Sequence, residues 1–179
     1  AYNRKTFPQR LMKTGETPPL FTDETYTVWT QKASAERVWK ALERKLKKEA
    51  CNMLMRVWLS ELPGSDELLL RYIRKTFDTK LDISLNFGDA DVLEVGKIAR
   101  KVGHEALYLK QFVRFQKAAD DLFFAPVRPI YNALPLTIDH FTDRFADQSW
   151  VIYDLRRKYG YYYDLQTARE ITFTDDDRL

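Results

Sequence analysis

The chain has 179 residues, of which 45% are hydrophobic, and its formal net charge is +3 at pH 7. This length suits one domain that buries a sizeable core, and so small a charge does not by itself indicate a nucleic-acid-binding protein. The sequence shows no signal peptide and no run of about 18 apolar residues, so we expect a soluble protein without membrane contact. The single cysteine, Cys51, excludes an internal disulfide and agrees with a cytoplasmic location.

Metal and cofactor sites are not indicated by the composition. Two histidines and one cysteine are too few for an ordinary zinc site, which uses four nitrogen or sulfur ligands, or three and a water molecule. The sequence also lacks a phosphate-binding loop, a dinucleotide fingerprint and a nucleophile elbow. We therefore expect no metal and no cofactor.

The first thirty residues contain few regular elements. Residues 2–5 resemble the last turn of a helix, so we expect a truncated N-terminus. Residues 13–24 include one glycine and two prolines, which predict a loop. Residues 25–30 alternate between β-favouring residues and predict a short strand.

A helical body is predicted over about residues 30–120. Ser34 is the expected N-cap of its first helix, with Val38, Leu42 and Leu46 at helical spacing. A second helix is predicted over 48–62. A third, over 67–77, is expected to be capped by Ser65 or Asp66. A long fourth helix is predicted from 92 to about 117, capped by Asp89 or Asp91 and kinked or divided near Gly103.

The remaining residues, about 121–173, predict a small α/β part. The expected elements are a strand at 122–125, a helix at 134–146, a β-hairpin from 150–155 and 161–165, and a short strand at 171–173. The predicted class is α+β, mainly α, with a helical body followed by a small antiparallel sheet. We expect residues 1–179 to form a single domain.

Glu105 is the most unusual residue of the helical body, because its spacing places it with Leu109 and Phe112 on the apolar face. A carboxylate there is costly unless it has a partner. The structural interpretation is a buried ion pair with Arg144, or with Arg114 of a neighbouring copy. The functional one is a catalytic acid or a carboxylate that positions a ligand.

Two further candidates lie in the C-terminal part. His140 is predicted on the polar side of its helix with Arg144, either simply solvated or contacting a phosphate or a base. Asp154 ends an apolar strand, on the same face as Trp150 and Ile152. It is predicted either to close the turn formed by the basic residues behind it or to act as a catalytic acid.

The clearest basic cluster is Arg156, Arg157 and Lys158, which is flanked by Tyr159 and other tyrosines. Cations interleaved with aromatic rings suit single-stranded or flipped nucleic acid, in which phosphates meet charge and bases meet rings. The alternative is a solvated hairpin tip above a tyrosine-rich sheet face.

A resemblance to a bacterial family, the domain of unknown function numbered 4130, rests on residue groups that occur together between about Thr30 and Asp164. These groups are Leu59–Gly64 with Leu69–Tyr72, His104–Glu105 with Lys110–Phe115, and Ala133–Leu136 with His140–Phe141, Arg144–Phe145 and Trp150–Asp154. Members of that family are described as DNA-metabolism proteins. They tend to be encoded beside a radical S-adenosylmethionine protein, and some are fused to a uracil-DNA-glycosylase-like domain. The resemblance implies a bacterial cytoplasmic accessory of DNA repair and no particular reaction.

Three functional hypotheses follow. In the first, the protein binds single-stranded or damaged DNA, or a repair partner such as those two proteins, through a surface of cations and rings: Arg114, His140, Arg144, Arg156, Arg157 and Tyr159. In the second, it is an enzyme acting on a nucleobase or phosphodiester, with Glu105 or Asp154 as acid and base and His140 as their partner. In the third, it is a protein-interaction domain that does not touch DNA.

Overall fold

The computed structural model describes residues 7–8, 10–12, 15–22, 24–118 and 121–173. The chain divides into two compact units, one formed by Ala1–Trp58 and Leu62–Gly96 and the other by Leu59–Glu61 and Lys97–Leu179. Each unit has its own buried residues, and each is described here by itself. The helix end predicted at residues 2–5 lies outside the described residues.

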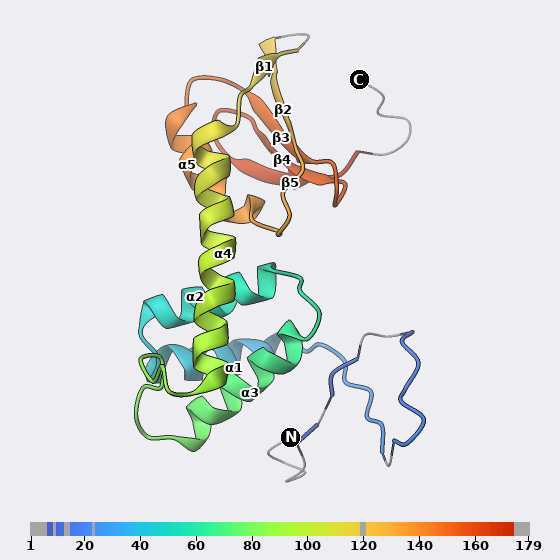
Figure 1. The fold of residues 1–179 in the computed structure, drawn as a ribbon. Helices are drawn as coiled ribbons and strands as arrows, with labels where there is room; N and C mark the ends of the chain where they lie inside the picture. Colours follow the sequence, from blue (N-terminus) through green and yellow to red (C-terminus); the bar gives the residue numbers. More distant parts are fainter. Residues whose placement is uncertain (1–6, 9, 13–14, 23, 119–120, 174–179) are drawn as a thin grey trace. The chain divides into compact units, whose positions relative to one another are not determined.

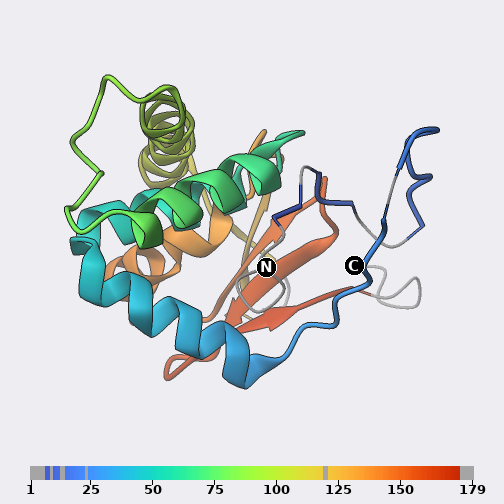
Figure 2. The same ribbon diagram turned by 90° about the horizontal axis from the view of Figure 1, so that it is seen from below.

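The first unit is helical. It contains α1 (Lys32–Lys45), most of α2 (Lys48–Leu59), α3 (Ser65–Asp78) and the start of α4 (Ala90–Phe112). Figures 1 and 2 show these elements with the irregular N-terminal segment. Each helix turns an apolar stripe inward, as its periodicity predicts. The buried side chains include Leu42, Leu46, Leu54, Val57, Leu68, Tyr72, Val92 and Val95.

The helix starts differ in part from the sequence prediction. Gln31, and not Ser34, occupies the N-cap of α1, and Ser34 lies within the helix with its hydroxyl 3.2 Å from Gln31 Oε1. Gly64 occupies the N-cap of α3 with a φ of 77°, a conformation that favours glycine over Ser65 or Asp66. The predicted cap of α4 is confirmed, since Asp89 Oδ1 accepts hydrogen bonds from the backbone nitrogens of Asp91 and Val92 at 2.9 and 3.2 Å.

Residues 25–30 form no strand, so that prediction is wrong. The segment is exposed, with Val28 86% and Trp29 80% accessible. An alternating pattern forms a stable strand only when neighbouring strands supply hydrogen bonds and a core to cover one face. This segment pairs with no described strand.

The long helix α4 is continuous through Gly103, so the predicted division there is wrong. It also ends at Phe112, about five residues earlier than predicted. Gln116 and Lys117 instead form the short strand β1, which pairs with Phe123 and Phe124. Arg114 Nη1 donates to the carbonyl oxygens of Gln111 and Val113 at 3.0 and 3.1 Å and so satisfies acceptors at the helix end.

The second unit contains a five-stranded mixed sheet in the order β1-β2-β3-β4-β5 (Figure 1). The strands β3, β4 and β5 are antiparallel neighbours, which includes the predicted hairpin. β2 runs parallel to β3, an arrangement that the sequence did not indicate. The α+β, mainly α class is confirmed. The strands are β1 (Gln116–Lys117), β2 (Phe123–Val127), β3 (Trp150–Asp154), β4 (Tyr159–Tyr163) and β5 (Ala168–Ile171).

The parallel pairing of β2 with β3 requires a crossover, and residues 128–149 supply it. The predicted helix over 134–146 is present there as two pieces, the 3-10 turn η2 (Leu134–Thr137) and the α-helix α5 (Ile138–Arg144). Pro135 in the first turn suits this start, because its missing N–H has no acceptor there in any case.

Pro126 lies inside β2 without breaking the sheet. The nitrogen of Phe123 donates to Ser149 O, and Val127 O accepts from Leu155, so these alternate residues face β3. Pro126 therefore turns its nitrogen to the opposite side, where β1 pairs only with Phe123 and Phe124. No ladder hydrogen bond is lost.

The core of the second unit lies between one face of the sheet and the helices. Trp150 and Ile152 of β3 pack with Phe141 of α5, as the alternation along β3 predicts. A neighbouring cluster joins α4 to the crossover through Val102, Ala106, Leu109 and Ala133. On the other sheet face, Tyr153 stacks on Phe173 with ring centroids 4.4 Å apart.

Candidate nucleic-acid interface

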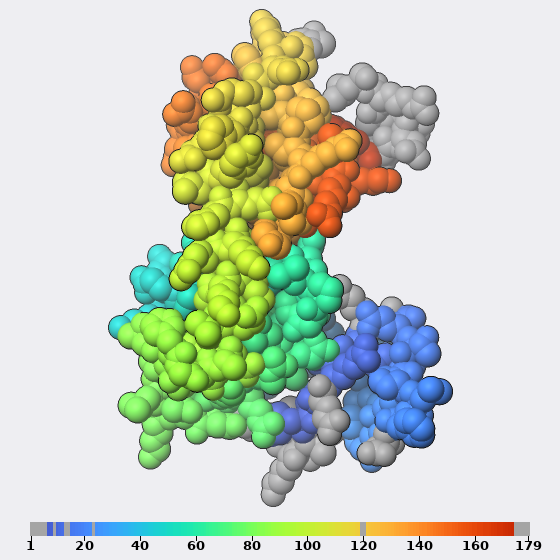
Figure 3. All heavy atoms as spheres, viewed as in Figure 1, coloured from blue at the N-terminus to red at the C-terminus, as the bar shows by residue number. Residues whose placement is uncertain are grey.

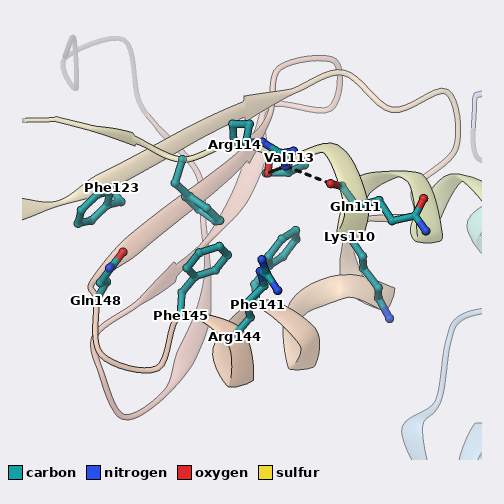
Figure 4. Close-up of a pocket in the computed structure, with 10 residues that line it drawn as sticks. Lys110, Gln111, Val113, Arg114, Phe123, Phe141, Arg144, Phe145 and Gln148 are labelled. Carbon is teal, nitrogen blue, oxygen red and sulfur yellow. Dashed lines mark hydrogen bonds between the residues drawn. The ribbon is translucent and has the colours of Figure 1, made fainter.

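A pocket of about 550 Å³ lies in the second unit, at the end of α4 and beside α5 and the start of β2. Figure 4 shows its side chains. Ten residues line it: Lys110, Gln111, Val113, Arg114, Phe115, Phe123, Phe141, Arg144, Phe145 and Gln148. They come from parts of the chain up to 38 residues apart, so the pocket exists only in the folded protein.

The apolar wall of the pocket is aromatic. Phe115 meets Phe141 and Phe145 edge to face, with ring centroids 5.6 and 5.1 Å apart. Phe141 is buried, whereas Phe115, Phe123 and Phe145 are half-buried. Half-buried rings that are fixed by neighbouring rings present rigid apolar surface at little entropic cost to a ligand.

Lys110, Arg114 and Arg144 bring positive charge to these rings, and none of the ten lining residues is acidic. The guanidinium carbon of Arg144 lies 5.7 Å from the centroid of the Phe145 ring. Arg114 is oriented by its bonds to the end of α4, as the dashed line in Figure 4 marks. Gln111 and Gln148 add amide groups that both donate and accept. The pocket therefore offers anion contacts, stacking surface and polar recognition together.

Arg114 and Arg144 were both predicted to bind nucleic acid, and the structure brings them to this one pocket. Phe141 and Phe145 were not among the predicted binding residues. Lys110, Phe115, Phe123 and Gln148 were not predicted to bind a ligand either. Lys110 precedes Arg114 by four residues, and this helical spacing is a signal that could have identified it.

Arg157, by contrast, is held inside the protein. Its side chain is 11% exposed and forms ion pairs with Asp154 at 2.9 Å and Glu61 at 2.7 Å. It also donates to the carbonyl oxygens of Pro129 and Ile130. Burial opposes its ionisation, but the two carboxylates outweigh this and raise the arginine's pKa. The prediction that Arg157 is free to contact DNA is corrected, because its donors are already used.

Arg156 and Tyr159 also donate hydrogen bonds to the segment 129–132. Arg156 is exposed, and its Nη1 donates to Ile130 O at 3.0 Å. The Tyr159 hydroxyl donates to the side-chain oxygen of Asn132. Burial raises the pKa of Tyr159, so its hydroxyl remains a proton donor. Neither residue lines the pocket.

Asp154 is fully buried and closes the turn after β3. Its Oδ1 accepts hydrogen bonds from the backbone nitrogens of Arg156 and Arg157 at 2.8 and 3.1 Å. Its Oδ2 bonds the Arg157 guanidinium. This is the turn arrangement predicted from the basic residues that follow it, and it occupies both carboxylate oxygens.

Glu105 is half-buried, but its partners differ from the predicted arginines Arg114 and Arg144. Its two oxygens accept hydrogen bonds from the backbone nitrogens of Ile130 and Tyr131, at 2.6 and 2.7 Å. The carboxylate thus holds a loop by charge-assisted hydrogen bonds. The sequence could not indicate this, because backbone amides are present at every position except proline.

His140 is half-buried, and its ring packs edge to face on Phe141 with centroids 5.4 Å apart. Its Nε2 is buried without a hydrogen-bond partner among the described residues. Of the two interpretations of His140, simple solvation does not fit this packing of its ring against α5, and contact with a phosphate or a base stays a prediction. Like Glu105 and Asp154, His140 does not line the pocket. In the described part of the chain no three His, Cys, Asp or Glu side chains gather in a way that could hold a metal ion.

Of the comparisons with known proteins, the one with protein families agrees with the resemblance noted above. No curated protein and no solved structure matches the chain. Within the described residues, no helix is both long enough and apolar enough to cross a membrane. The model of the family described as a domain of unknown function, DUF4130, matches residues 63–177, which include β1 to β5 and every pocket residue. The chain belongs to the DUF4130 family.

Proposed function

We propose that this protein binds single-stranded or flipped-out DNA and that the pocket beside α5 receives one nucleotide. The observation that carries the proposal is the combination of three cations with half-buried phenyl rings and no carboxylate among the lining residues. Phosphates are attracted to Lys110, Arg114 and Arg144, and a base has an apolar surface on which to stack. A volume of about 550 Å³ lies in the usual range of small-molecule sites.

The proposal concerns binding and not catalysis. The oxygens of Glu105 and Asp154 already accept hydrogen bonds from backbone amides and from Arg157. Glu105, Asp154 and His140 all lie outside the pocket lining. A catalytic acid needs hydrogen-bond access to the reacting group. The geometry therefore supports the enzyme hypothesis less well than the binding hypothesis.

In the cell, we propose an accessory role in DNA metabolism, in line with the family resemblance. A radical S-adenosylmethionine protein and a uracil-DNA-glycosylase-like domain are the proposed protein partners. A pull-down of either one with this chain, with and without nuclease, would separate contact through DNA from direct protein contact. Capture that resists nuclease would favour the third hypothesis, an interaction domain without DNA.

Fluorescence anisotropy with a labelled oligothymidylate tests the DNA proposal. We expect binding that weakens as salt increases, with a slope of about −0.7 in log–log form per phosphate neutralised. The variant that combines Lys110→Ala with Arg144→Ala should bind at least about tenfold more weakly and with a smaller salt slope. These side chains are better targets than Arg114, which also satisfies carbonyls at the end of α4.

A matched control is the double variant Lys40→Ala and Arg44→Ala. These cations are exposed and four residues apart on α1, far in sequence from the pocket. The control should bind like the wild type. An undetectable or salt-independent anisotropy change in the wild type contradicts the proposal, and so does an equal loss in both double variants.

A further inference from the structure

Tyr108 and Phe112 form an exposed aromatic pair on α4, and we propose that it stacks a second base of the bound strand. The ligand would then be single-stranded DNA of two or more nucleotides and not a free nucleotide. This inference rests on the proposed function of the pocket, and it extends the binding surface along the helix.

The pair is unusual in its exposure and its geometry. Tyr108 is 61% and Phe112 56% exposed, and their ring centroids lie 4.6 Å apart with 37° between the ring planes. Figure 3 shows the C-terminal half of α4 at the surface. A single exposed apolar side chain is ordinary, but two adjacent rings on one helix form a surface to which a flat group can bind.

The aromatic pair is continuous with the pocket. Gln111 lines the pocket, and on α4 it is the immediate neighbour of Phe112 and three residues from Tyr108. Residues three or four apart share one side of a helix. A strand with one base in the pocket can therefore pass Gln111 and place its next base against these rings.

Charge on this side of α4 favours a polyanion over an apolar peptide. Arg100 and Lys101 are exposed, and they precede the pair on the same side of the helix. Arg114 follows the pair at the pocket, whereas Lys110 lies between the two rings in sequence and therefore on the opposite side of the helix. The carboxylate of Glu105 bonds the amides of Ile130 and Tyr131 and keeps its single negative charge, which the cations on this side outnumber. Cations on both sides of stacking rings are the usual arrangement in single-strand-binding proteins.

The test is a competition measurement with the full chain. A labelled oligothymidylate is displaced by thymidine monophosphate or by an unlabelled oligothymidylate, in the wild type and in Tyr108→Ala/Phe112→Ala. We expect the double variant to bind the oligonucleotide about tenfold more weakly, because each stacked base contributes roughly a five- to hundredfold gain in affinity. Its affinity for the mononucleotide should not change.

Two controls make the result specific. Trp58→Ala removes a ring that is 64% exposed from another helix, and it should leave both affinities unchanged. Tyr108→Phe keeps the ring and should bind like the wild type. Circular dichroism should show the same melting for all variants, because the substituted side chains are exposed.

The outcomes separate this inference from the function on which it rests. If the wild type binds neither ligand, the proposed function fails. If the wild type binds the oligonucleotide and the double variant binds it equally well, the second stacking site is wrong and the pocket proposal stands. Equal loss of mononucleotide and oligonucleotide binding in the double variant also overturns the inference. Equally tight binding of oligouridylate by the wild type overturns the choice of DNA as the ligand. A change of oligomeric state in the double variant without a change in DNA affinity overturns the inference too.

Discussion

Glu105 Oε2 lies 2.7 Å from the backbone nitrogen of Tyr131, and the other carboxylate oxygen bonds the nitrogen of Ile130. A glutamine at position 105 would have one carbonyl oxygen for these two donors and would turn an NH₂ group toward the second. We therefore expect Glu105→Gln to lower the free energy of unfolding by ~1–2 kcal/mol, measured by urea denaturation. Glu36→Gln, at an exposed position of α1, should change it by less than about 0.5 kcal/mol. Equal stability of both variants would show that Glu105 does not hold the loop.

Asp154→Asn should destabilise the protein more strongly, by ~2–4 kcal/mol. Asparagine can keep the backbone hydrogen bonds at Oδ1, but its NH₂ group would face the Arg157 guanidinium and leave that charge poorly compensated. Asp164→Asn is the matched control, since Asp164 Oδ1 makes the same kind of turn with Gln166 and Thr167. The control should lose less than about 1 kcal/mol, because asparagine suits such turns. Similar losses of stability in the two variants would mean that the ion pair of Asp154 with Arg157 does not contribute to stability.

Replacing either of two glycines by alanine should change the stability of the protein, but in opposite directions. A Cβ at Gly160 in β4 would lie 2.3 Å from Ile152 O and 2.9 Å from Tyr153 Cα, and these backbone atoms cannot move aside. We expect Gly160→Ala to lower stability by about 3 kcal/mol or more, or to prevent folding. Gly96 in α4 has open space around it, so Gly96→Ala should raise stability by about 0.5–1 kcal/mol. Thermal melting by circular dichroism tests both, and a stable Gly160→Ala protein would contradict the packing of β3 against β4.

At acid pH the helical unit should lose the contribution that the Asp89 carboxylate makes to the free energy of unfolding. The hydrogen bond from Lys75 holds the pKa of this carboxyl below its usual range, and the cap of α4 acts in the same direction. Because the folded state has the lower pKa, the stabilisation is present above about pH 4 and is lost as the pH falls through the folded value. Asp89→Asn keeps a capping oxygen but loses the charge.

The stability difference between the wild type and Asp89→Asn should therefore be greatest near neutral pH. It should amount to at most about 1 kcal/mol, because the pair with Lys75 is open to solvent. Urea titrations at a series of pH values measure the difference. A stability difference that stays constant down to about pH 2 would show that the carboxylate charge does not cause it.

Local patterns predicted most elements and two of the turns whose partners are close in sequence, although not the caps of α1 and α3. Asp89 caps α4 and Asp154 closes the turn after β3, since each bonds amides two or three residues away. The alternation along β3 also placed Trp150 and Ile152 on the core face. These features depend on backbone geometry within one turn or strand, which the residue types largely determine.

Features that depend on distant partners could not be predicted. Glu105 was expected beside an arginine, but it bonds amides 25 and 26 residues further along the chain. Arg157 was predicted to bind nucleic acid because cations and tyrosines are dense around it, but its Nε donates a hydrogen bond to Glu61, 96 residues away. Local density of charge therefore says little about which charges are free. The pocket joins Arg114 to Arg144 only because β2 runs parallel to β3 and returns α5 to the end of α4.

The proline in β2 limits how this protein can recruit partners. An incoming strand beside β2 would need a donor at position 126, and Pro126 has none. On the opposite border of the sheet, β5 is four residues long and carries the exposed charges of Arg169 and Glu170. The part of β2 that β1 leaves uncovered and the border at β5 thus both discourage β-augmentation and edge-to-edge aggregation. A partner of this unit is expected to dock on side chains, and the cationic aromatic surface around α4 and α5 is the one best suited to receive it.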